Sequence, residues 1–112
     1  MRQAFERNMR RAGLSEWITV HEMRSDEAAR RWNTPIDMLY LDGDISIAGS
    51  REIFQAWSPF LREGGVLAIN GTVERTSRTG SYRVVDEFVR PPDYEDVRRV
   101  DHVTFARKGK KA

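Results

Sequence analysis

The sequence of 112 residues contains no cysteine. This absence excludes disulfide bonds, cysteine nucleophiles and zinc sites built from thiolates. No apolar run approaches the roughly 20 residues that a membrane-spanning helix requires, and no segment resembles a signal peptide. We therefore expect a cytoplasmic protein that does not interact with a membrane.

A strong charge of one sign is also missing. The 19 basic and 17 acidic residues leave a net charge of only +2, and the two signs are interspersed along the chain. Such a surface attracts polyanions only weakly over long range, so a nucleic acid is not the expected partner. Aromatic residues are present, and Trp17, Trp32 and Trp57 are expected to anchor the core or helix packing. Length and composition predict a single domain that covers residues 1–112.

Hydrophobic periodicity divides the chain into alternating helices and strands. Helices are predicted near residues 1–12, 25–33, 46–61 and 82–89, and strands near 16–23, 36–41, 65–70 and, as one strand or two, 96–108. The near-continuous apolar run at 36–41 is typical of a parallel strand that is buried on both faces. This alternation predicts an α/β fold with a mostly parallel sheet.

Several residues have the chemistry of helix ends. Ser25 precedes two acidic residues and is expected to cap the second helix. Asp44 or Ser46 is expected to cap the third helix, and Gly64 and Gly65 are expected to end it.

Polar residues follow two of the predicted strands. Asp42 and Asp44 flank Gly43 after the first of these strands, and Asn70 and Thr72 follow the second. Ligands of parallel α/β sheets bind outside the carboxyl ends of the strands, so these residues form a candidate site. The alternative is an ordinary acidic turn that only caps the following helix.

The same stretches resemble a known family. The segments "PIDMLYLDGDIS" and "FQAWSPFLREGGVLAINGT" are similar to the second half of class I S-adenosylmethionine-dependent methyltransferases, in the subgroup whose fourth strand ends in Asp-Gly-Asp-His-Ser. In addition, "FERNMRRAGL" resembles the helix after the second strand, "ITVHEMRSDEAA" the third strand and its loop, and "VTFARK" the last strand. The resemblance implies a partial Rossmann-like sheet, mostly parallel with an antiparallel C-terminal edge, that lacks the first two strands.

The resemblance also implies an activity and a set of residues. The activity is methyl transfer from S-adenosylmethionine to an acceptor, which is expected to be a small molecule. Ser25 corresponds to a serine in the loop that holds the adenine, and Asp42, with Gly43 beside it, lies near the methionine part of the cofactor. In metal-dependent members Asp42 would be a magnesium ligand, and Asn70 is the other donor that remains here.

Two departures argue against metal-assisted catalysis. Ile45 stands where the family has histidine, and Ile45 can neither bind a metal nor transfer a proton. The His-Asp-Thr pattern after the fifth strand reads Asn70, Gly71, Thr72, so a carboxylate has become glycine. A divalent cation needs several oxygen ligands, and one carboxylate makes a poor site.

The family's glycine-rich cofactor loop and its first two strands have no counterpart in this sequence, which predicts a truncated domain. In the family's strand order, 3-2-1-4-5-7-6, the two absent strands lie between the third and the fourth. The third strand could pair directly with the fourth, a homodimer partner or another complementing chain could fill the gap, or Met1 could be a late start. A non-catalytic remnant that uses its open sheet edge for interaction or dimerisation is therefore the alternative function.

Overall fold

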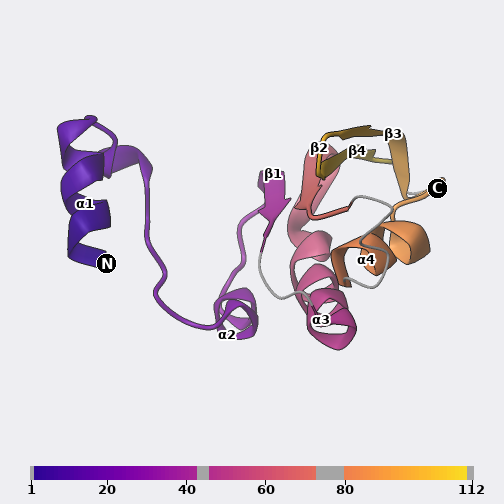
Figure 1. Cartoon of the computed structure of the whole chain (residues 1–112), viewed down its shortest axis with the longest axis horizontal. Coiled ribbons are helices and arrows are strands. Elements are labelled where there is room, and N and C mark those ends of the chain that lie inside the picture. The colour runs from indigo at the N-terminus through magenta and orange to yellow at the C-terminus, as the bar shows by residue number, and fades with distance from the viewer. Residues whose placement is uncertain (1, 43–45, 73–79, 111–112) are drawn as a thin grey trace.

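A computed structural model describes residues 2–42, 46–72 and 80–110 (Figure 1). Its α-helices are α1 (Arg2–Arg11), α2 (Ser25–Arg30), α3 (Ile47–Trp57) and α4 (Gly80–Phe88), and its short 3-10 helices are η1 (Ser15–Trp17) and η2 (Ser58–Phe60). Its strands are β1 (Ile36–Leu41), β2 (Leu61–Asn70), β3 (Tyr94–Val100) and β4 (Val103–Lys108). Within the described ranges, no helix is long and apolar enough to cross a membrane.

The four strands form one mixed sheet in the order β1-β2-β4-β3. β1 and β2 are parallel, whereas β4 is antiparallel to both β2 and β3. This order is that of the last four strands of the sheet that the sequence resembles, 4-5-7-6. The structure thus confirms the predicted partial methyltransferase-like α/β fold with its antiparallel C-terminal edge, but the sheet is mixed rather than mostly parallel, because only β1 and β2 form a parallel pair.

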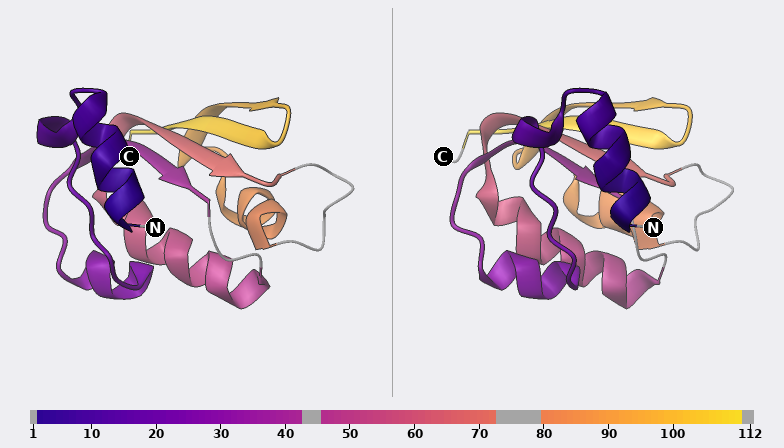
Figure 2. Two further views of the ribbon diagram at one scale, coloured as in Figure 1. Left: turned by 60° about the vertical axis from the view of Figure 1, so that its left-hand side comes forward. Right: turned by 90° about the vertical axis from the view of Figure 1, so that its left-hand side faces the viewer.

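The hydrophobic core lies between one face of this sheet and the helices α3 and α4 (Figure 2). Leu67 and Ile69 of β2 are almost fully buried and pack against this helical layer. Within it, the ring of Phe54 on α3 stacks on Phe88 of α4 with centroids 5.4 Å apart, and Tyr94 of β3 lies 6.1 Å from Phe54. Aromatic packing therefore joins both helices to the far edge of the sheet.

Burial also changes the acidity of Tyr94. Only 4% of this residue is exposed, and the loss of hydration raises the pKa of its phenol to about 12, even though a hydrogen bond with Ser58 acts in the opposite direction. Because the neutral phenol is favoured in the folded state, its contribution to stability is complete below pH 10 and is lost as the pH rises through about 12.

An alkaline absorbance titration tests this effect. We expect a tyrosine ionisation step near pH 12 that is absent in Tyr94→Phe and retained in the control variant Tyr40→Phe. A Tyr94→Phe titration curve identical to that of the wild type would contradict the assignment.

The predicted burial of β1 on both faces is wrong. Leu39 is buried against α3 and α4, but Met38 and Tyr40 on the opposite face are 56% and 53% exposed. Among the described residues, helices cover only one face of the sheet (Figure 2), and β1 is an edge strand. An apolar run alone cannot distinguish this arrangement from full burial.

The predicted strand at 16–23 does not form. Residues 15–17 form η1, and an exposed segment leads from there to α2 without joining the sheet. In Figure 1 this segment runs well apart from β1, so the direct pairing of third and fourth strands is not observed. Strand propensity needs a neighbouring strand to take effect, and the described part of the chain offers none at this position.

The predicted boundary between the third helix and the next strand is also wrong. Helix α3 ends at Trp57, and Gly64 and Gly65 lie inside β2. The register of β1 against β2 shifts here, and Gly64 has a φ of +78°, which favours glycine. At Gly65, a Cβ would lie 3.0 Å from the carbonyl oxygen of Asp37 on β1. The glycines thus form a bulge and a close strand contact rather than a helix end.

Of the predicted helix N-caps, Ser46 is confirmed and Ser25 is not. Ser46 is the N-cap of α3, and its hydroxyl accepts a hydrogen bond from the Gly49 backbone at 3.1 Å. Asp44, the alternative cap, lies outside the described residues. Ser25 does not cap α2, because Arg24 occupies the N-cap position and Ser25 is the first helical residue. The Ser25 hydroxyl has a different partner, described below.

Candidate functional site

The carboxyl ends of β1 and β2 bring Asp42 and Asn70 together. The parallel pairing places Leu41 beside Ile69, so the next residue of each strand projects from the same edge of the sheet. Asn70 Nδ2 donates a hydrogen bond to Asp42 Oδ1 at 3.2 Å. Two residues predicted to share a site from their positions after parallel strands are thus in direct contact. Gly43, predicted beside them, lies outside the described residues.

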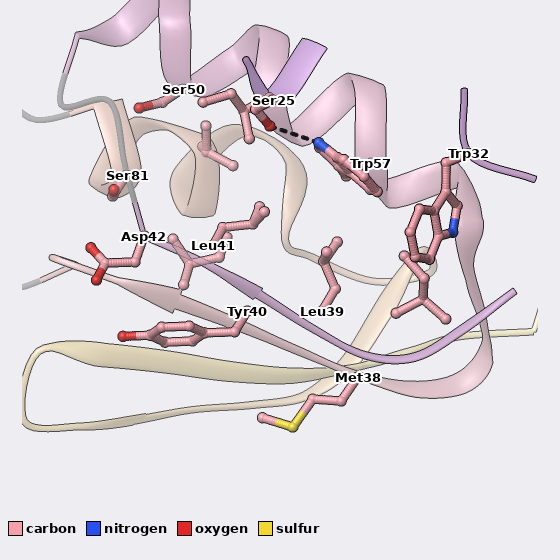
Figure 3. Close-up of a pocket in the computed structure, with 14 residues that line it drawn as sticks. Ser25, Trp32, Met38, Leu39, Tyr40, Leu41, Asp42, Ser50, Trp57 and Ser81 are labelled. Carbon is pink, nitrogen blue, oxygen red and sulfur yellow. Dashed lines mark hydrogen bonds between the residues drawn. The ribbon is translucent and has the colours of Figure 1, made fainter. Parts of the chain in front are cut away.

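A hollow of about 500 Å³ extends from Asp42 along β1, under α2 and α3 (Figure 3). Figure 3 shows Asp42 and Ser81 toward one end and Trp32 toward the other. Most of the lining is apolar and comes from β1, β2, α3 and α4, with Leu39, Leu41, Ile53, Ile69 and Val84. The predicted residues Ser25 and Asp42 both line this one hollow. It combines an apolar wall with polar groups at defined points, as small-molecule sites do.

Tryptophans shape the end of the hollow away from Asp42. Trp57 Nε1 donates a hydrogen bond to Ser25 Oγ at 2.7 Å, which ties α2 to α3. Trp32 meets Trp57 edge to face, with ring centroids 5.5 Å apart. Since the serine oxygen accepts from the indole, its own proton remains available for a second partner.

The predicted roles of the three tryptophans are only partly correct. Trp32 and Trp57 are half-buried and help to pack α2 on α3, but they also line the hollow. Trp17 is 77% exposed, so its expected role as a core or packing anchor is wrong. The contact of Trp57 with Ser25 joins residues 32 positions apart, and no local pattern in the sequence could have revealed it.

Backbone hydrogen bonds fix Gly71 and Thr72, the two residues after Asn70. The N–H groups of Gly71 and Thr72 donate to the carbonyl of His102 at 2.7 and 3.0 Å, and the Thr72 and Thr104 hydroxyls lie 2.6 Å apart in a buried pair. Gly71 has a φ of +81°, a conformation that an aspartate adopts only with strain. Gly71, which stands where the resemblance implied a carboxylate, therefore has a backbone role of its own.

The described donors do not fit a magnesium site. Magnesium requires near-octahedral oxygen coordination, and here one carboxylate faces the N–H₂ group of an amide rather than its oxygen. Among the residues that the structure describes, no group of three His, Cys, Asp or Glu side chains is placed to hold a metal ion. Asp42 and Asn70 thus provide one carboxylate that is held by an amide N–H₂ group, and not a set of metal ligands.

Comparison with known proteins connects this site to a family. The sequence model of the methyltransferase domain family, described as "Methyltransferase domain", matches residues 1–72, which include α1 to β2 and both Asp42 and Asn70. No curated protein matches the chain.

Several solved structures share the fold. A proposed caffeoyl-CoA O-methyltransferase from Staphylococcus aureus has a TM-score of 0.70 and 18% identity, over 96% of this chain and 59% of that one. A Corynebacterium glutamicum protein has a TM-score of 0.68 and 21% identity, over 93% of this chain and 54% of that one.

The MycE methyltransferase of the mycinamycin biosynthetic pathway was solved with Mg, SAH and mycinamycin VI. Its TM-score is 0.55 at 23% identity, over 77% of this chain and 28% of that one. The chain therefore spans between about a quarter and three fifths of the length of these structures. At these identities the likeness shows the fold alone, whereas the family match covers more than half of the chain. By that match, the chain belongs to the methyltransferase domain family.

Proposed function

We propose that this chain contributes to a methyltransferase that uses S-adenosylmethionine and a small-molecule acceptor. The observation that supports this most strongly is the hollow that Ser25 and Asp42 both line, inside the region matched by the family. When bound, S-adenosylmethionine supplies an activated methyl group. The chain's own contribution is then to position the cofactor, because methyl transfer depends mainly on alignment of donor and acceptor.

Three residues are proposed to hold the cofactor. Asp42 provides a carboxylate at the end of β1 that attracts the cationic methionine part. Ser25, oriented by its hydrogen bond from Trp57, retains a proton to donate to the adenine end. Gly43 follows Asp42 directly and is proposed to let the backbone approach the cofactor closely. No step is assigned to a metal, since Asp42 and Asn70 alone do not fit one.

A calorimetric titration with S-adenosylhomocysteine tests the proposal. We expect saturable binding to the purified chain and an affinity at least about tenfold lower for Asp42→Asn, which corresponds to roughly 1.4 kcal/mol. Ser25→Ala is expected to weaken binding less, because a neutral hydrogen bond is weaker than a charged one.

Asp37→Asn is the matched control. Asp37 lies at the other end of β1, pairs with Arg62 at 2.5 Å and does not line the hollow, so its variant should bind like the wild type. No heat at millimolar ligand, or equal losses for Asp37→Asn and Asp42→Asn, would overturn the proposed site.

A second candidate function is association through the sheet edge. The outer edge of β1 has no strand partner among the described residues, and the exposed Met38 and Tyr40 lie beside that edge. Unpaired strand edges favour pairing with another chain. We therefore also propose a role in dimerisation or in complementing a second chain, with or without catalysis.

A further inference from the structure

The outer edge of β1 is protected only at its start. Protected edges carry proline or charged residues; here Pro35 and Asp37 stand at the beginning of the strand, whereas the rest of it, Met38–Leu41, carries neither. Met38 and Tyr40 are exposed on one face, Leu39 and Leu41 lie on the other, and all four line the hollow. Both faces at this edge would therefore lose apolar exposure if one more strand were added.

The same chain carries a strand-forming segment without a strand partner. Residues 17–20 read Trp-Ile-Thr-Val, and Trp17, Ile18 and Val20 are 77%, 38% and 40% exposed. Ile18 already has extended backbone angles, φ −125° and ψ 128°. Within the described chain, Ile18, Thr19 and Val20 make no backbone-to-backbone hydrogen bond. Residues 18–20, here called the free strand segment, thus have the β-branched composition that strand pairing favours, and Ile18 already has the backbone conformation for it.

We infer that the free strand segment of a second copy pairs along the outer edge of β1. Each copy has one unpaired β1 edge and one unpaired free strand segment among its described residues. In a dimer in which each segment pairs with the β1 edge of the other copy, both edges and both segments gain a strand partner. The segment's own β1 is an unsuitable partner, since Figure 1 shows the two running well apart within one chain. The inference specifies the occupant for the association role proposed above and does not depend on methyl transfer.

Side-chain alternation supports this pairing. Ile18 and Val20 point to the same face of an extended strand, and Thr19 points to the other. Placed beside β1, Ile18 and Val20 can lie on the face of Leu39 and Leu41, while Thr19 lies on the face of Met38 and Tyr40. Main-chain hydrogen bonds then supply the affinity, as in other cases where a strand is added to a sheet edge.

Analytical ultracentrifugation of the purified chain over a wide concentration range tests the inference. We expect a reversible monomer–dimer equilibrium. Thr19→Pro removes a backbone donor, and Tyr40→Lys places a charge on the edge, so each should raise the dimer dissociation constant about tenfold or more. Thr19 and Tyr40 lie outside the core, and Lys110→Pro is the control with unchanged association because Lys110 is exposed and distant in sequence from both features.

Cross-linking between single-cysteine variants tests the geometry directly, because the natural chain contains no cysteine. After mixing and mild oxidation, Thr19→Cys should form a disulfide with Tyr40→Cys or Met38→Cys on the other copy, and Lys110→Cys should not.

A chain that stays monomeric at every concentration overturns the inference, and the β1 edge would then pair with a different protein. It is equally overturned by larger open polymers, or by a dimer that Thr19→Pro leaves intact. Binding of S-adenosylhomocysteine is measured separately, so failure of one proposal does not imply failure of the other.

Discussion

Phe54→Ala is expected to lower the free energy of unfolding by about 4 kcal/mol. Phe54 is only 5% exposed and contacts the rings of Phe88 and Tyr94, so its removal leaves a cavity where α3, α4 and β3 meet. A domain of this size has a total stability of about 5–15 kcal/mol, and the loss should lower the melting temperature by roughly 15–20 °C. Thermal unfolding followed by circular dichroism measures the shift.

Phe5→Ala is the matched control for this variant. Phe5 lies on α1, is 41% exposed and is not part of the core. Its truncation removes the same atoms without opening a buried cavity, and surface changes of this kind usually alter stability by less than about 0.5 kcal/mol. Equal destabilisation by the two substitutions would show that Phe54 does not have the central packing role described here.

Gly80→Ala is expected to destabilise the protein by about 3 kcal/mol. Gly80 begins α4, and a Cβ at this position would collide with the backbone carbonyl of Ser46 and the side chain of Ser50 at the start of α3. The collision involves backbone, so it can be relieved only by moving one helix away from the other. Because Ser50 and Ser81 line the hollow beside this contact, the affinity for S-adenosylhomocysteine should also fall.

Two further variants separate collision from backbone strain. Gly13 has a φ of +72° but no atom within 4 Å of a built Cβ, so Gly13→Ala should cost only the roughly 1 kcal/mol of left-handed strain. Combining Gly80→Ala with Ser50→Gly should recover part of the loss, since it removes one of the two collisions. Denaturant unfolding measures all three, and a Gly80→Ala loss no larger than that of Gly13→Ala would refute the collision.

Sequence periodicity predicted most helices and strands because their signals are local. The amphipathic pattern around Phe54 and the apolar runs of β1 and β2 each specify their own element. The segment around Ile18 and Val20 has an equally strong strand pattern, yet it is extended and unpaired. A segment becomes a β-strand only when it forms hydrogen bonds with a neighbouring strand, and the sequence of the segment does not reveal whether such a neighbour is present.

The candidate site could likewise be predicted only in part from the sequence. The rule that parallel strands end at one edge correctly placed Asp42 next to Asn70. It could not reveal that Trp57 reaches Ser25, because that contact depends on how α2 lies across α3. The Ser25 capping prediction failed because Arg24 already provides the extended residue before the helix, and the serine side chain is used between helices instead.

The position of β4 in the sheet also affects how the protein can fold during synthesis. β4 follows β2 and β3 in the chain but lies between them in the sheet, and it supplies partners to both. Until residues 103–108 have been synthesised, β2 has an unpaired edge opposite β1, and β3, once made, has no partner among the described strands. The half of the sheet that contains β3 and β4 can therefore form only after β4 has been made, and until then unpaired strand edges favour aggregation.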